Sequence, residues 1–178
     1  MKIVLLGAES VGKSTLTKQL AAHYSMPYFE EYARVVAEKQ HNNFVFEDLE
    51  LIARQQIKEL NSETANQSEL CFFDTDLLIT KVWFEVVYQQ IPEWFLEALP
   101  KNKPDFYLLC STEVPWVYDP VRTAGPIYRE TLQKLYEQEA INSQKPVAKI
   151  TGLGYARFMN AVNVIDTFRN CSIYNNSK

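Results

Sequence analysis

The segment Gly7-Ala8-Glu9-Ser10-Val11-Gly12-Lys13-Ser14 fits the pattern G-x-x-x-x-G-K-[ST], whose residue types bind phosphate groups. Its glycines let the main chain wrap around phosphate oxygens, and the helix that follows adds the positive end of its dipole. Lys13 is placed to reach the β- and γ-phosphates, and the Ser14 hydroxyl is placed to bind Mg²⁺. An apolar run before the segment and an amphipathic pattern after it favour a phosphate loop over a plain glycine-rich turn. The expected nucleotide-binding residues are Glu9, Ser10, Val11, Gly12, Lys13, Ser14 and Thr15.

Two carboxylates, Asp74 and Asp76, follow the apolar run at residues 70–73. Enzymes with a phosphate loop hold Mg²⁺ with an acid at the end of a neighbouring strand, so Asp74 is the expected metal ligand beside Ser14. Asp76 is then the candidate catalytic base, which would accept a proton from a substrate hydroxyl. The alternative for either carboxylate is a structural role as the N-cap of the helix expected from Leu77.

Other candidates for contact with an acceptor substrate are Glu31, Arg34 and Trp83. Glu31 and Arg34 stand three residues apart, so both can face the acceptor, and Glu31 is a second candidate for the base. An ordinary surface pair of helical side chains is the alternative. Trp83, like Trp94 and Trp116, can stack on a flat ring, and a cationic ring would gain cation–π attraction. The alternative for these aromatic residues is packing in the core.

A loop expected at about residues 114–126 contains Arg122 and has the length of a lid over an active site. An arginine that closes over the phosphates adds positive charge where the transition state needs it, and Arg122 is the first candidate for this catalytic and nucleotide-binding role. Arg129 is the second candidate, and a solvent-facing arginine is the alternative for both. Gly152 lies in a glycine-containing turn on which an adenine could rest, although a plain turn explains it equally well.

Short apolar runs alternate with amphipathic segments along the chain. We expect strands at residues 2–6, 27–30, 70–74, 106–110 and 146–150, and helices at 13–24, 31–40, 46–68, 77–88, 92–99, 126–142 and 155–168. In the second helix, Val35 and Val36 are both expected on the inner face. The alternation predicts an α/β fold with a parallel sheet. Residues 1–170 are expected to form one domain, followed by a polar tail at 171–178.

Composition and local patterns exclude several classes of protein. The formal net charge of −4 and the absence of a Lys/Arg run argue against a nucleic-acid partner. No apolar stretch is long enough for a membrane span, and the three cysteines match no zinc or disulfide pattern, so we expect a reduced, cytoplasmic protein. Asn102-Lys103-Pro104-Asp105 resembles a guanine-binding motif of GTPases, but it precedes a strand instead of following one. The sequence does not indicate an oligomeric state.

Taken together, these motifs resemble those of a known family. The phosphate loop, Glu31-Tyr32-Ala33-Arg34, Phe73-Asp74-Thr75-Asp76, Pro115-Trp116-Val117 with Asp119 and Arg122, and Arg157-Phe158 are similar to the ribosylnicotinamide kinase domain of bifunctional bacterial NAD-biosynthesis proteins. The resemblance runs from Ile3 to about Asp166. The family that it points to lies within a broad group of AAA-type ATPases. It implies a three-layer fold around a five-stranded parallel sheet of the nucleoside and nucleotide kinase type. It also implies transfer of the γ-phosphoryl group of Mg·ATP to the 5′-hydroxyl of nicotinamide riboside.

Two other functions stay open at this stage. One is a kinase for another nucleoside or a small alcohol. The other is a non-catalytic nucleotide sensor or ATPase module that acts through a partner. The acidic pair and the candidate lid arginine favour a kinase, because a sensor has no need of a base on the acceptor side.

Overall fold

The computed structural model describes residues 1–40, 43–117 and 125–175. Five parallel strands form one sheet in the order β2-β3-β1-β4-β5. Their bounds are β1 (Lys2–Leu6), β2 (Tyr28–Phe29), β3 (Cys71–Asp74), β4 (Phe106–Cys110) and β5 (Val147–Ile150). β1 is central because its apolar run is buried on both faces of the sheet, with Ile3 to Leu6 at 0% exposure. The parallel sheet expected from the alternating pattern is confirmed.

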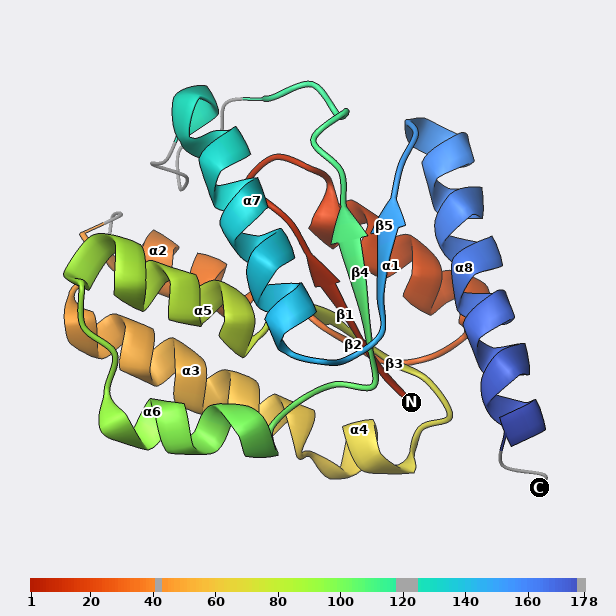
Figure 1. Cartoon of the computed structure of the whole chain (residues 1–178), viewed down its shortest axis with the longest axis horizontal. Coiled ribbons are helices and arrows are strands. Elements are labelled where there is room, and N and C mark those ends of the chain that lie inside the picture. The colour runs from red at the N-terminus through yellow and green to blue at the C-terminus, as the bar shows by residue number, and fades with distance from the viewer. Residues whose placement is uncertain (41–42, 118–124, 176–178) are drawn as a thin grey trace.

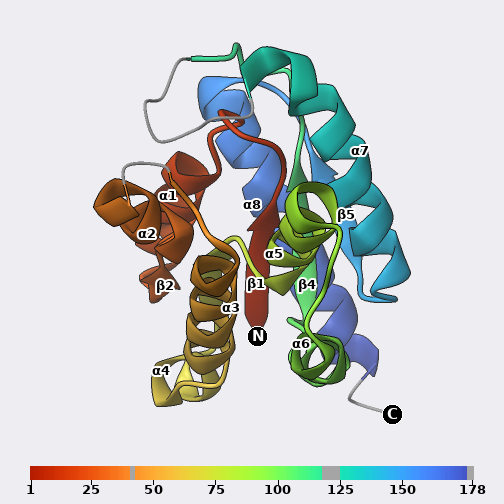
Figure 2. The same ribbon diagram turned by 90° about the vertical axis from the view of Figure 1, so that its left-hand side faces the viewer.

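Helices cover both faces of the sheet and make three layers (Figures 1 and 2). α1 (Lys13–Tyr24) and α8 (Gly154–Asn175) lie on one face. α3 (Phe46–Leu60), α5 (Leu77–Trp83) and α7 (Gly125–Asn142) lie on the other. The shorter helices are α2 (Tyr32–Gln40), α4 (Glu63–Gln67) and α6 (Glu93–Ala98), with a π-helical turn at Phe84–Tyr88 and a 3₁₀ turn at Leu99–Lys101. None of the helices in these described ranges is long and apolar enough to cross a membrane.

A second apolar cluster lies apart from the main core and joins α2, α3, α5 and α6. Its buried members are Val36, Leu49, Ile52, Ala53, Leu77, Phe84 and Phe95. α3 buries the face that carries Ile52 and Leu60. Val35 is 40% exposed, so the expectation that it faces inward with Val36 is wrong. Adjacent helical positions point about 100° apart, and only one of the two can face this cluster.

Three helices differ from their expected lengths. The helix expected over residues 46–68 is two helices, α3 and α4, because Ser62 begins a new helix by accepting a hydrogen bond from the Ala65 amide at 3.2 Å. The helix expected over 77–88 changes from α to π geometry at Phe84. α8 continues to Asn175, beyond its expected end at Phe168. Phe168 stacks on Phe106 of β4, with ring centroids 4.2 Å apart, and this contact anchors the last turns of α8 to the sheet.

Candidate functional site

The phosphate loop joins β1 to α1 and curls around the side chain of Lys13. The Lys13 ammonium donates to the carbonyl oxygens of Gly7 at 2.9 Å and Ala8 at 3.0 Å, and the residue is 5% exposed. Gly7 has a φ of +140°, and a Cβ there would lie 2.8 Å from the Cys110 carbonyl oxygen. Only glycine fits this position without displacing β4. Gly12 has a φ of +77° and precedes the first residue of α1.

The first turn of α1 presents open hydrogen-bond donors. Its first helical bond runs from the Leu16 amide to the Gly12 carbonyl at 3.0 Å. The main-chain amides of Lys13, Ser14 and Thr15 bond to no acceptor within the described part of the chain. Open amides at a helix N-terminus bind anions, and the helix dipole adds to the attraction. The local geometry is therefore what the motif predicts for a loop that holds phosphate.

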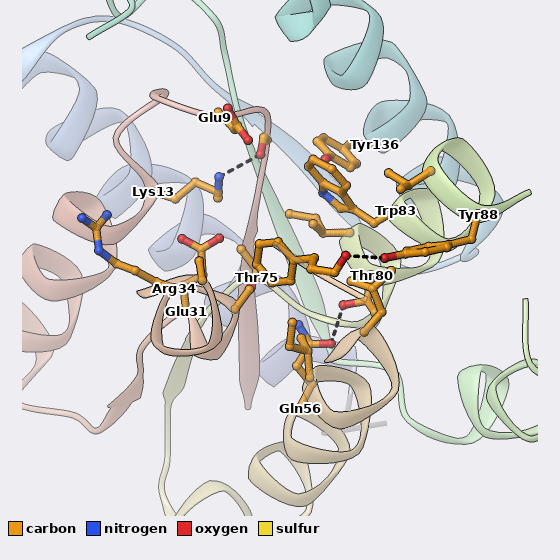
Figure 3. Close-up of a pocket in the computed structure, with 18 of the residues that line it drawn as sticks. Glu9, Lys13, Glu31, Arg34, Gln56, Thr75, Thr80, Trp83, Tyr88 and Tyr136 are labelled. Carbon is orange, nitrogen blue, oxygen red and sulfur yellow. Dashed lines mark hydrogen bonds between the residues drawn. The ribbon is translucent and has the colours of Figure 1, made fainter. Parts of the chain in front are cut away.

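A cavity of about 420 Å³ begins at this loop (Figure 3). Lys13 and Glu9 line one end, and Glu31 and Arg34 lie on the same side as Lys13. Trp83 lies across the cavity from them. The remaining wall is mostly apolar or aromatic and includes Phe44, Leu49, Ile52, Ile79, Val87, Tyr88 and Tyr136. This volume is in the range of small-molecule sites. The cavity joins the phosphate loop at one end to an aromatic compartment suited to a ring at the other.

Polar contacts hold the far end of this cavity in shape. The Thr80 hydroxyl of α5 donates to the Gln56 side-chain oxygen of α3 at 2.8 Å, and both residues line the cavity. The Tyr88 hydroxyl donates to the Phe44 carbonyl oxygen at 2.9 Å. The first contact joins α5 to α3, and the second joins the π-helical turn at Phe84–Tyr88 to the segment that precedes α3. They leave the Gln56 amide nitrogen as a polar group beside the aromatic residues.

A second cavity of about 350 Å³ adjoins the loop on its other side. Ser14 and Asp74 both line it, as expected for two ligands of one metal ion. Both offer oxygen atoms, which Mg²⁺ prefers, and Mg²⁺ commonly takes only one or two protein ligands beside nucleotide phosphates. No group of three His, Cys, Asp or Glu residues among the described positions could hold a metal alone. The donor set therefore fits Mg²⁺ bound together with a nucleotide. Glu31 and Arg34 line this cavity as well as the first.

Asp76 lies apart from both cavities. One carboxylate oxygen accepts from the Leu78 amide at 2.9 Å and caps α5, and the other accepts from the Tyr107 hydroxyl at 2.8 Å. Burial raises the pKa of Asp76 to about 6, although both hydrogen bonds act to lower it. Burial also raises the pKa of Tyr107, which keeps its hydroxyl protonated as the donor. The geometry thus gives Asp76 the capping role that the sequence left open, and it favours Glu31 as the candidate base.

The other expected residues have more varied positions. Trp94 lines neither cavity: its indole nitrogen donates to Glu50 at 2.5 Å, and Arg54 lies 3.9 Å above its ring. Gly152 donates its amide to Glu113 at 2.6 Å, and its carbonyl accepts from Arg157 at 3.2 Å. An adenine that used these Gly152 groups would have to compete with both partners. Arg122 lies outside the described residues.

Three side chains that sequence analysis did not place here hold the outer side of the phosphate loop. The Gln133 side chain accepts from the Ala8 amide at 2.9 Å and donates to the Cys110 carbonyl at 3.0 Å. Arg129 donates to the Ser10 carbonyl at 3.2 Å, and Arg157 donates to the Val11 carbonyl at 3.0 Å. Arg129 is therefore buried against the loop, and the solvent-facing alternative for it is wrong. Gln133 carries no local signal of this function, since its contacts lie 23 and 125 positions away.

Comparison with curated proteins finds NadR proteins of two bacteria among its matches. The trifunctional NAD biosynthesis/regulator protein NadR of Escherichia coli (strain K12) is 25% identical over 170 residues, which is 92% of this chain and 41% of that protein. NadR of Salmonella typhimurium (strain LT2) matches to the same extent. The chain spans about two fifths of the length of these relatives.

Solved structures share the fold. NadR in complex with NR has a TM-score of 0.76 at 21% identity, and NadR in complex with NAD and AMP-PNP has 0.73 at 19%. Each match covers 92% of this chain and 48% of the other. Deoxyadenosine kinase from M. mycoides, with products dCMP and a flexible dCDP bound, has 0.67 at 18% identity, covering 94% of this chain and all of that one. These likenesses confirm the three-layer fold of nucleoside kinases that the resemblance implied.

A protein family described as an AAA domain matches residues 2–157, which include the phosphate loop, all five strands and the arginine at 157. Since this match covers most of the 178 residues, the chain belongs to that AAA-domain family.

Proposed function

We propose that this protein is an ATP-dependent kinase that phosphorylates the 5′-hydroxyl of nicotinamide riboside and so makes nicotinamide mononucleotide. The observation that carries the proposal is the continuous cavity from Lys13 to the aromatic compartment at Trp83, with Glu31 on its wall (Figure 3). Such a cavity can hold a donor phosphate and a ring-bearing acceptor in one space. Proximity of the two reactants is a large part of what an enzyme must supply for phosphoryl transfer.

Each step of the transfer has a candidate residue. The amides of the phosphate loop and Lys13 bind the β- and γ-phosphates, and Ser14 with Asp74 would hold Mg²⁺, which neutralises phosphate charge when bound. The acceptor oxygen attacks the γ-phosphorus, the bond from that phosphorus to the β–γ bridging oxygen breaks, and ADP leaves. Glu31 accepts the hydroxyl proton and later releases it to water. Arg122 is proposed to balance the spreading charge.

The lining of the cavity suits a pyridinium ring. Trp83 and Tyr88 offer aromatic faces, and a cationic ring beside them gains cation–π attraction. The Gln56 amide can donate to a carbonyl oxygen such as that of a carboxamide. The names of the relatives support this acceptor, because NadR is a NAD biosynthesis protein and has been crystallised with NR.

The decisive experiment incubates purified protein with Mg·ATP and one acceptor at a time: nicotinamide riboside, adenosine, deoxyadenosine, cytidine or glycerol. Product is identified by mass spectrometry, and ADP release is followed in parallel. We expect nicotinamide mononucleotide, with the largest kcat/KM for nicotinamide riboside. Faster turnover of another acceptor would refute nicotinamide riboside as the acceptor but would still support a kinase activity. Slow ADP release that no acceptor stimulates would instead support the nucleotide-sensor alternative.

The base assignment has its own test in Glu31→Gln. Loss of a general base lowers kcat by about 10²- to 10⁴-fold while leaving KM for ATP nearly unchanged. Glu47→Gln is the control, because Glu47 is an exposed carboxylate that lines neither cavity. If the two variants have equal kcat, Glu31 is not the base.

A further inference from the structure

Two buried arginines lie behind the phosphate loop. Arg129 is 8% exposed and Arg157 is 5% exposed. No carboxylate of any described residue forms an ion pair with either guanidinium. Buried charges usually have a partner of opposite charge, because removing an ion from water costs several kcal/mol. Two such cations side by side therefore need a physical explanation.

Most of their hydrogen bonds are to main-chain carbonyls, and Arg157 also donates to the Ser111 hydroxyl at 3.3 Å. Arg129 donates to the carbonyls of Ser10 at 3.2 Å and Val114 at 2.6 Å. Arg157 donates to the Val11 carbonyl at 3.0 Å and the Ser111 carbonyl at 3.3 Å. Each arginine thus connects the phosphate loop to the segment that leaves β4.

The direction of these bonds bears on phosphate binding. In a planar trans peptide the C=O and N–H groups point in opposite directions. Arginines that hold the Ser10 and Val11 carbonyls on the outer side of the loop therefore point the amides of Val11 and Gly12 towards its inner side. Cationic donors also polarise these peptide groups, which makes the amides stronger donors.

Both guanidiniums are buried, so their charges act on the loop in surroundings of low dielectric constant. Burial lowers the pKa of Arg129, the nearby Glu130 carboxylate partly opposes this shift, and the positive charge of Arg157 adds to it. The ligand-free protein thus holds two positive charges that disfavour each other. A polyphosphate bound on the inner side of the loop supplies the missing negative charge.

We propose that Arg129 and Arg157 are positioning residues that form a cationic support for the phosphate loop. They orient its amides and attract a nucleotide in proportion to its phosphate charge. This proposal rests on the nucleotide binding in the proposed function but not on the identity of the acceptor.

The test measures nucleotide affinity in Arg157→Met, Arg157→Lys and Arg129→Met by calorimetry with ATP, ADP and AMP at constant free Mg²⁺. We expect Arg157→Met to weaken ATP binding by about 10- to 100-fold, ADP binding less, and AMP binding least. Arg157→Lys keeps the charge and should retain most of the preference for ATP. Arg129→Met should act in the same direction, and it keeps the test informative if the first variant does not fold.

The pattern of affinity across ATP, ADP and AMP separates this proposal from a purely structural role. Removing either guanidinium leaves buried carbonyl oxygens without their donor, so the Tm of the ligand-free protein should fall in either case. The matched control is Arg169→Met, since Arg169 is also on α8 but pairs with Glu69 and lies away from the loop. The nucleotide affinities of this variant should equal those of the wild type. Equal loss of affinity for AMP and ATP, or no loss at all, would overturn the proposal. A wild type that binds ATP but leaves nicotinamide riboside unmodified would refute the acceptor assignment alone.

Discussion

Replacing Asp76 with asparagine should change how the stability of the protein depends on pH. Burial raises the pKa of Asp76 from its ordinary value of 3.8 to about 6 in the folded chain. A carboxyl group whose pKa is raised by folding stabilises the protein below its unfolded pKa, and this contribution is lost as pH rises through the folded pKa. The full difference corresponds to about 3 kcal/mol, of which about 2 kcal/mol falls between pH 4.5 and 7.5.

Urea unfolding of wild type and Asp76→Asn, in EDTA and without nucleotide, measures this effect. The unfolding free energy of the wild type minus that of the variant should fall by about 2 kcal/mol from pH 4.5 to 7.5. Asparagine keeps an acceptor for the Leu78 amide, so the cap of α5 survives. Tyr107→Phe is the companion variant: it removes a bond that lowers the pKa of Asp76 and should move the transition to higher pH. A difference that stays flat, or rises with pH, would show that the carboxyl is not buried as described.

Two further predictions concern the loop and the thiols. Gly7→Ala should lower the unfolding free energy in urea by about 3 kcal/mol or more, because the new Cβ would meet the Cys110 carbonyl. Gly12→Ala places its Cβ in open space and should cost only about 1–2 kcal/mol of backbone strain. Equal losses for the two variants would contradict the close approach of Gly7 to β4. Iodoacetamide should add a single label to the native protein, at exposed Cys171, as read by intact mass spectrometry. Cys71 is buried and its pKa is raised to about 11, so early labelling there would contradict the structure.

Much of the fold could be predicted because its signals are local. The strands are short apolar runs buried on both faces, and such runs are visible in sequence. The split between α3 and α4 could have been predicted from the capping signal at Ser62, but the apolar pattern continues past that residue and obscures it. The change to π geometry at Phe84 has no comparable signal. It depends on packing of that ring against Phe46 and Phe95, from helices on either side.

The candidate site likewise contains some residues that sequence could identify and others that it could not. Lys13, Ser14 and Asp74 could be found because the motif and the strand end are each contiguous in sequence. The residues behind the loop could not be found in this way, because Arg157 meets Val11 only after 146 positions of chain have folded. A buried arginine looks the same in sequence as a solvated one. What distinguishes the two is the set of carbonyls that the fold brings to it.

The Asp74-Thr75-Asp76 segment shows why two nearby carboxylates need not share one task. Thr75 has a φ of +77°, which is rare for a β-branched residue, and its amide donates to the Leu5 carbonyl at 3.2 Å. This turn separates its neighbours: Asp74 lines the cavity with Ser14, and Asp76 points to Tyr107 inside the protein. Strain of this kind costs about 1–3 kcal/mol and persists where the surroundings enforce it. We infer that the strained turn lets the end of β3 supply both a metal ligand, Asp74, and a helix cap, Asp76. The base that accepts the proton of the acceptor hydroxyl is then proposed to be Glu31.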